Sequence, residues 1–206
     1  MLGYFGPPGT FTQQALLRIN EGEDIRPYDT VQVTLDAVRA GEVRAALVPI
    51  ENSVEGGVSA TLDYLAGSDP LMIVREVVIQ VQFVLCARPG TKLADVKHVI
   101  THGHAHAQTR EWIAKHLKGA DVTEHGSTAA AAKEVAGPES KYDAAICAQV
   151  AADHYGLEVL ASNIGDNRHA LTRFVLVSKP GRPAPFTGSD KTTLVAYMRK
   201  DHPGAL

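Results

Sequence analysis

The sequence predicts an α/β fold with largely parallel sheets, and two observations support this prediction. Apolar runs of strand length alternate with segments of helical length along most of the chain. The 206 residues are 45% hydrophobic, which is close to the average for globular proteins and enough to bury a full core in one or two domains.

Seven apolar runs have the length and composition of strands. Most are rich in β-branched or other apolar side chains and are bounded by turn residues, as expected of strands inside a sheet. The predicted strands are Leu2–Phe5, Ala45–Pro49, Met72–Ile79, Gln82–Ala87, His98–Thr101, Ala144–Cys147 and Thr172–Val177.

Six segments between these strands have the length of helices, and several begin with Ser or Thr. In the first of them Thr10 precedes a run of helix formers in which Phe11, Ala15 and Leu16 share one side, which is typical of an N-capped amphipathic helix. The predicted helices are residues 10–17, Val33–Ala40, Ala60–Ala66, Gln108–Leu117, Ser127–Val135 and Ala148–Tyr155.

The alternation of strands and helices breaks once, because Gln82–Ala87 follows Met72–Ile79 with no helix between them. This break predicts a crossover between two lobes, with a cleft between them of the kind that holds small ligands. We expect lobe one at about 1–78 plus about 165–178, and lobe two at about 79–164.

Beyond the second lobe, three prolines within Lys179–Pro185 predict a linker over residues 179–189. Thr192–Met198 then has the pattern of a strand that begins another domain. Residues 190–206 are too few to bury a core of their own. We therefore expect a truncated domain there, or a native chain that continues.

Composition narrows the class of protein. A formal charge of −3 with dispersed Lys and Arg argues against a nucleic-acid partner. No apolar run reaches the roughly 18 residues needed to cross a bilayer, and Met1 is not followed by a signal-peptide pattern, so we expect a cytoplasmic protein without membrane contact. Cys86 and Cys147 lie in apolar stretches and are expected to be small core residues.

The most informative segment joins a polar loop, Asn163–Asn167, to the apolar strand that begins at Thr172. The hydroxyl of Thr172 and the guanidinium of Arg173 would then stand at the mouth of a strand, where scaffolds present chemistry to small molecules. A guanidinium suits a carboxylate. Taken alone, the pair could also be an ordinary β-branched strand residue and a solvated charge.

Two further junctions place polar groups after strands. Gly6–Thr10 follows a strand and opens a helix, so its free N–H groups could hold an anion, although it lacks the Lys of a phosphate P-loop and could be a bare turn. Glu51–Gly57 also follows a strand, and Asn52 and Ser53 offer neutral donors there. Local turn capping is the alternative for this segment.

The second lobe contributes Thr101–His106, in which three histidines alternate, and the helix start at Ser127–Thr128. We expect no metal site, because His104 and His106 would project from different faces of a helix. A donor-rich loop that faces the cleft is expected instead. No junction supplies a nucleophile beside a base, and the implied ligand is a small carboxylate.

Three motifs, Gly6–Phe11, Val48–Gly56 and Asn163–Phe174, occur in this order and together resemble the prephenate dehydratase family over residues 1 to about 178. The resemblance implies a two-lobed, periplasmic-binding-protein-like catalytic domain with its active site in the cleft. It also implies a homodimer or homotetramer. Residues 190–206 resemble the opening of the family's regulatory ACT domain, which binds L-phenylalanine, so this effector is expected to act only on a full-length protein.

By this resemblance the reaction is the decarboxylating dehydration of prephenate to phenylpyruvate, without a cofactor. The resemblance makes Thr172 the essential residue, and our hypothesis is that its hydroxyl donates a hydrogen bond to the departing hydroxyl group. Further substrate-binding residues are expected at Arg173, Thr10, Phe11, Asn52, Ser53, Thr101, His102, Thr128 and Phe174.

Two positions depart from the family pattern. His104 stands where the family often has Gln, and Ala170 stands where many members have an Asn that could support Thr172. Two other functions stay open. An arogenate dehydratase would share the scaffold, and a non-catalytic module could bind a small carboxylate in the same cleft.

Overall fold

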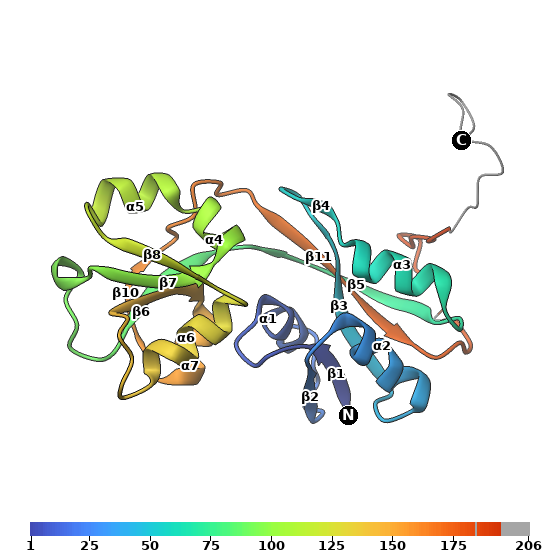
Figure 1. The fold of residues 1–206 in the computed structure, drawn as a ribbon. Helices are drawn as coiled ribbons and strands as arrows, with labels where there is room; N and C mark the ends of the chain where they lie inside the picture. The colour runs from blue at the N-terminus through green and yellow to red at the C-terminus, as the bar shows by residue number, and fades with distance from the viewer. Residues whose placement is uncertain (184, 195–206) are drawn as a thin grey trace.

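The computed structural model describes residues 1–183 and 185–194, and it folds them into two sheets flanked by helices. The α/β prediction is confirmed. Figure 1 shows the sheets as two separate bodies, the first with α1 to α3 and the second with α4 to α7. No helix among the described residues is long and apolar enough to cross a membrane.

The first sheet has six strands in the order β2-β1-β3-β11-β5, with β4 paired to β3. Its strands are β1 (Leu2–Phe5), β2 (Ile25–Tyr28), β3 (Ala45–Asn52), β4 (Gly56–Gly57), β5 (Met72–Gln80) and β11 (Leu171–Ser178). The second sheet has five strands in the order β10-β6-β9-β7-β8. Its strands are β6 (Phe83–Ala87), β7 (His98–His102), β8 (Asp121–His125), β9 (Ala144–Ala148) and β10 (Glu158–Ser162).

Helices cover both faces of each sheet. Residues of α1 join the apolar cluster on one face of the first sheet, and residues of α2 and α3 join the clusters on the other. In the second sheet α5 contributes to the cluster on one face, and α6 and α7 contribute to the opposite one. The helices are α1 (Phe11–Leu17), α2 (Val31–Ala40), α3 (Ser59–Gly67), α4 (Gly103–Ala107), α5 (Arg110–His116), α6 (Thr128–Ala136) and α7 (Gln149–Tyr155), with a 3₁₀ turn at Leu93–Asp95.

The sheets are mixed, so the prediction of largely parallel pairing was wrong. Five of the nine strand pairs in the described residues are antiparallel. Two of these pairs are made by β11, which returns from the second sheet and enters the first between β3 and β5, antiparallel to both. Two more are made by β6, which lies between β10 and β9 and is antiparallel to both, and the fifth joins β4 to β3. A chain that crosses twice between two sheets does not build each of them from successive βαβ units.

The two crossings lie side by side. The chain leaves the first sheet after Gln80 and enters the second at Phe83, and it returns through residues 163–170. The amide of Val81 donates to the carbonyl oxygen of Ala170 at 2.8 Å, and the amide of Ile164 donates to that of Phe83 at 3.1 Å. These two bonds join the crossings into one double connection, which fixes where the two sheets meet.

Four strands escaped the sequence prediction, namely β2, β4, β8 and β10. Three of them are the outer strands of their sheets, and β4 is a two-residue strand off the main path. Outer strands are half exposed and need no apolar run, so their sequence signal is weak. Of the expected strand at Thr192–Met198, residues 195–198 lie outside the described part of the chain, as do residues 199–206 of the expected ACT segment.

Candidate active site

A cleft of about 310 Å³ lies between the two sheets. Val81, at the first crossing, lies in its wall. From the first sheet and its connections the cleft is lined by Thr10, Phe11, Asn52, Glu55, Thr172 and Phe174. From the second it is lined by Phe83, His102, His104, Gln108, Ser127 and Thr128.

Thr172 enters the cleft from the start of β11. Its side chain is 8% exposed, and the residue is paired with Asn52 of β3 across the sheet. The amide Nδ2 of Asn52 donates to the Thr172 hydroxyl oxygen at 3.0 Å. Residues 120 positions apart therefore meet at the cleft wall because β11 lies next to β3.

Asn52 is itself held in one orientation. Its Oδ1 accepts from the amide of Val54 at 2.8 Å and, more weakly, from that of Glu55 at 3.4 Å. With Oδ1 fixed by the turn, Nδ2 must face Thr172. A hydroxyl has one hydrogen to donate and two lone pairs, so the Asn52 bond occupies a lone pair and leaves the hydrogen. Within the described residues that hydrogen has no acceptor, which leaves it to a ligand in the cleft.

Aromatic rings form the apolar part of the cleft wall. Phe174 lies two residues beyond Thr172 on the same face of β11 and is 2% exposed. Phe11 from α1 meets Phe83 from β6 edge to face, with ring centroids 5.5 Å apart. This contact joins the two sheets at the cleft, and it presents ring edges and faces that suit a planar ligand.

No lysine or arginine is found among the described residues that line the cleft. Positive potential comes from helix starts instead. Ser127 caps the nine-residue helix α6 by accepting from the amide of Ala130 at 3.0 Å, and Thr128 follows it at the cleft. The Thr128 hydroxyl makes no hydrogen bond within the described residues. The start of a helix favours a negative group.

The hydroxyl of Thr10, unlike that of Thr128, has hydrogen-bond partners in the protein. Thr10 lines the cleft, but its hydroxyl oxygen caps α1 by accepting from the amide of Gln13 at 3.4 Å, and the hydroxyl lies 3.4 Å from the carbonyl oxygen of Phe5. Its main contribution is to the start of α1, which brings Phe11 into the wall.

His102 caps the short helix α4. Its Nδ1 accepts from the amide of His104 at 3.2 Å, so a neutral ring carries its proton on Nε2. Burial, and then the neighbouring His104, lower the pKa of His102 below its usual 6.5. His102 is therefore neutral at pH 7 and offers an N–H donor at the cleft wall.

His104 lines the cleft and pairs across it. Its Nδ1 lies 2.5 Å from a carboxylate oxygen of Glu55, which follows β3 in the first sheet. Since His104 belongs to α4 of the second lobe, this pair links the two lobes. Glu55 itself was not among the predicted site residues, nor was Gln108. Sequence reasoning had no signal for either, because each is brought to the cleft by a strand end or helix packing.

Three predicted site residues do not line the cleft. Thr101 is fully buried, and its hydroxyl donates to the carbonyl oxygen of Ile146 at 2.7 Å, so it joins β7 to β9. Ser53 is exposed and exchanges hydrogen bonds with the backbone of Leu171, one at 2.9 Å through its own hydroxyl. Both positions are used to hold strands together.

Arg173 is the third predicted site residue that does not line the cleft. Side chains alternate along a strand, so Arg173 leaves β11 on the face opposite to Thr172. Its guanidinium pairs with the carboxylates of Glu51 and Glu76, the latter at 2.7 Å. The expected carboxylate-binding role is therefore corrected here, because a substrate in the cleft would not meet this group.

Within the described residues no group of three or more His, Cys, Asp or Glu side chains is placed to hold a metal ion. The three alternating histidines of the sequence have other partners. His102 and His104 take the partners described above, and Nδ1 of His106 lies 3.8 Å from a carboxylate oxygen of Glu124.

Comparison with known proteins decides the family. A family model described as prephenate dehydratase matches residues 2–182. The chain belongs to the prephenate dehydratase family. It is 46% identical over 198 residues to a prephenate dehydratase of Amycolatopsis methanolica, covering 95% of this chain and 64% of that protein. It is also 40% identical over 220 residues to one of Mycolicibacterium vanbaalenii, of which it covers 70%.

Two solved structures superpose on most of this chain. A prephenate dehydratase from Arthrobacter aurescens in complex with L-Phe superposes with a TM-score of 0.92 at 50% identity, covering 99% of this chain and 68% of that one. A quorum-quenching acylase, GqqA, superposes at 0.77 with 32% identity, covering 89% of this chain and 66% of that one. The chain thus spans about two thirds of the length of the proteins it matches.

Proposed function

We propose that this chain carries the catalytic part of a prephenate dehydratase, which converts prephenate to phenylpyruvate. Membership of the family supports this, and one geometric observation carries it: the Thr172 hydroxyl stands in an interlobe cleft with its oxygen held by Asn52 and its hydrogen free for a ligand. The cleft volume of about 310 Å³ lies in the range of small-molecule sites.

The reaction requires two bonds of prephenate to break, and no covalent bond to the protein has to form. The bond between the ring and its carboxylate breaks, and its electron pair becomes part of the new aromatic ring as carbon dioxide leaves. The bond between the ring and the hydroxyl group breaks at the para carbon of the ring, and the departing hydroxide takes up a proton that comes from solvent, so that it leaves as water. Thr172 donates its hydrogen bond to the oxygen on which negative charge develops, which is where a fixed donor lowers the barrier most.

Anion binding then falls to groups other than arginine. The start of α6 at Ser127 and Thr128, together with the Nε2–H of His102, would receive the two carboxylates of prephenate. Phe11, Phe83 and Phe174 would pack against the ring. Both lobes contribute residues to this site, so substrate binding would favour closure of one lobe onto the other.

Thr172→Ala tests this directly. Phenylpyruvate formation from prephenate, followed by ultraviolet absorbance, should fall by about 10²-fold or more in kcat, because one preorganised donor at a developing charge is worth that much. Thr172→Ser keeps a hydroxyl and should retain much more activity. If the alanine variant turns over within threefold of the parent, Thr172 does not have this role.

The same assay separates the alternatives. A higher kcat/KM on arogenate than on prephenate would make the chain an arogenate dehydratase. Saturable prephenate binding without phenylpyruvate would make it a binding module. A parallel run with a chelator checks the proposal that no metal takes part.

The remaining parts of the proposal concern the whole protein. Residues 1–178 would form the catalytic domain, 179–189 the linker and 190–206 the start of an ACT domain. The L-Phe complex of the Arthrobacter protein supports L-phenylalanine as effector of a full-length homodimer or homotetramer. We also propose a cytoplasmic location; Cys86 and Cys147 are buried free cysteines of the second lobe.

A further inference from the structure

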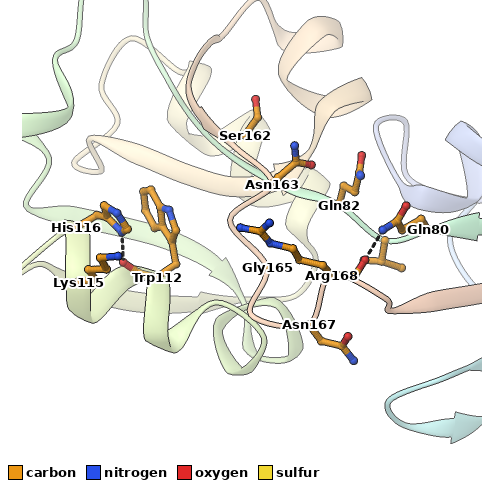
Figure 2. A pocket seen from close by; sticks show the side chains of 11 residues that line it. Gln80, Gln82, Trp112, Lys115, His116, Ser162, Asn163, Gly165, Asn167 and Arg168 are labelled. Carbon is orange, nitrogen blue, oxygen red and sulfur yellow. Dashed lines mark hydrogen bonds between the residues drawn. The ribbon is translucent and has the colours of Figure 1, made fainter.

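A second cavity, of about 540 Å³, lies at the double connection between the two lobes and outside the cleft. Its walls come from the first crossing at Gln80–Gln82, the return crossing at Ser162–Arg168, and α5. Of the described residues, only Val81 lines both this cavity and the cleft. Figure 2 shows its side chains, with Trp112, Lys115 and His116 on one wall and Arg168 and Asn163 on the other.

The charges in this cavity are of one sign. Lys115 and Arg168 both line it, whereas no Asp or Glu does among the residues that the structure describes. Neither cation lies within ion-pair distance of a carboxylate in residues 1–183 and 185–194. Two uncompensated cations facing one hollow concentrate positive potential there and favour an anion.

An aromatic wall stands beside these cations. The rings of Trp112 and His116 are stacked, with centroids 4.7 Å apart and an interplanar angle of 22°. Nδ1 of His116 lies 2.9 Å from the carbonyl oxygen of Trp112, a hydrogen bond that fixes the orientation of the imidazole ring. Trp112 is half-buried and packs against the core of the second lobe. The cavity thus has a flat, rigid apolar surface.

The two walls are tied to each other. Asp166, from the return crossing, accepts from the amides of Glu111 at 3.1 Å and Trp112 at 3.2 Å at the start of α5. Its own amide donates to the carbonyl oxygen of Gln108 at 2.7 Å. The carboxylate of Asp166 is therefore bonded to backbone amides, and the side chain of Gln80 donates to the carbonyl oxygen of Arg168. Binding groups that are already held in place lose little conformational entropy when a ligand binds.

We propose that this cavity binds a small carboxylate that carries an aromatic ring. The ring stacks on the wall formed by Trp112 and His116, and the carboxylate is received by Arg168 and Lys115. Among the residues that the structure describes, no acidic side chain lines the cavity, so the α-ammonium group of an amino acid would have no counter-charge there. The site therefore discriminates against aromatic amino acids in favour of aromatic acids that lack the amine.

The single tryptophan of the chain makes this testable without turnover, because Trp112 is the only tryptophan and it lies in the cavity. Tryptophan emission of the purified chain is titrated with 3-phenylpropionate, with 3-phenylpropanol, with propionate and with L-phenylalanine. We expect a saturable change with 3-phenylpropionate and at least about tenfold weaker responses with the other three, because each lacks the ring or the carboxylate or adds an unpaired ammonium.

Variants locate the response. The double variant Lys115→Gln, Arg168→Gln keeps Trp112 and should weaken 3-phenylpropionate binding about tenfold or more. Lys118→Gln removes a charge from beyond the same helix, outside the cavity lining, and should leave it unchanged. Asn52→Asp alters the cleft alone and should also leave it unchanged.

Three results would overturn the proposal: no saturable change, equal binding by the neutral alcohol, or a response lost in the cleft variant and kept in the cavity variant. The last result would place the ligand in the cleft. The test needs no dehydratase activity, so its outcome is separate from that of the function proposed above.

Discussion

The amide nitrogen of Asn52 lies 3.0 Å from the hydroxyl oxygen of Thr172, and this bond joins the ends of two neighbouring antiparallel strands at the cleft. Ala170, two residues before this threonine, is 1% exposed in the core and has no polar side chain to support the hydroxyl. Asn52 makes the supporting bond from β3. The direction of this bond matters for the proposed reaction, because a donor at Asn52 leaves the hydroxyl hydrogen of Thr172 for a ligand in the cleft.

Asn52→Asp should therefore lower kcat by about 10²-fold with little change in stability. A carboxylate keeps the oxygen that accepts from Val54 and Glu55, but it would take the hydrogen of Thr172 in place of donating to its oxygen. Steady-state kinetics and urea unfolding measure the two effects. Asn52→Ala is the control, since it should also lose about 1 kcal/mol of stability with the turn bonds. An aspartate variant of near-parental kcat would refute the assigned bond direction.

Arg173→Gln should leave the KM for prephenate within about twofold of the parent, because the guanidinium is on the far face of the sheet. Its pairs with Glu51 and Glu76 are part-exposed, so the free energy of unfolding should fall by about 1 kcal/mol or less. A double-mutant cycle with Glu76→Gln measures the coupling. A tenfold rise in KM would restore the original carboxylate-binding prediction.

The same ion pairs predict a response to acid. Hydrogen bonds from Lys191 and then Arg173 lower the pKa of Glu76 below its usual 4.5, although burial opposes them. A carboxyl group with a depressed pKa in the folded state stabilises it above about pH 4.5, and this contribution is lost as the pH falls further. Glu76→Gln should remove part of the acid sensitivity of the melting temperature between pH 5 and pH 3.

Thr101→Val and Thr128→Val should have opposite effects. Thr101 is buried and its hydroxyl bonds to the carbonyl oxygen of Ile146, so its loss should cost about 1 to 3 kcal/mol of stability and leave kcat/KM unchanged. Thr128 lines the cleft at the start of α6, so its loss should reduce kcat/KM with little effect on stability. Parallel thermal melts and kinetics check both. Equal kinetic defects would argue for a substrate role of Thr101.

His102 should make the fold less stable in mild acid. Its pKa is lowered in the folded state, so the unfolded chain binds more protons below about pH 6.5, and stability falls as the pH drops through that range. Protonation of Nδ1 also breaks its bond with the amide of His104. His102→Asn keeps a capping acceptor and cannot titrate, so it should lose less stability than the parent between pH 7.5 and pH 5.5. Imidazole NMR signals of His102 that titrate at or above pH 6.5 would contradict this.

The fully buried strands were all predicted, whereas the strands that escaped prediction are partly or mostly exposed. Strands such as β6 and β9 are buried along their whole length and read as continuous apolar runs. Strands β2 and β8 lie at sheet edges and neither is a continuous apolar run: β2 contains Arg26 and Pro27, and β8 is polar at every position except Val122. The assignment of the domain boundaries to particular residue ranges stays a prediction.

The candidate site was likewise predicted only in part. Thr172, Asn52, Thr10, Phe11, His102, Thr128 and Phe174 were named from motifs at strand ends, and the fold brings these seven to one cleft. Arg173 was misplaced because adjacent residues on a strand face opposite sides, which a motif does not show. Thr101 and Ser53 were misread because a hydroxyl that holds two strands together and one that binds substrate have the same sequence signal.

By itself the sequence determined the α/β class and the family, and it predicted Thr172 as the essential residue, because these depend on local composition and on motifs of consecutive residues. Only the tertiary structure decided which donor supports Thr172, where Arg173 finds its partners, and that a second, positively charged cavity with an aromatic wall lies at the crossings. Each of these depends on residues far apart in the chain, and their meeting is set by how β11 inserts between β3 and β5.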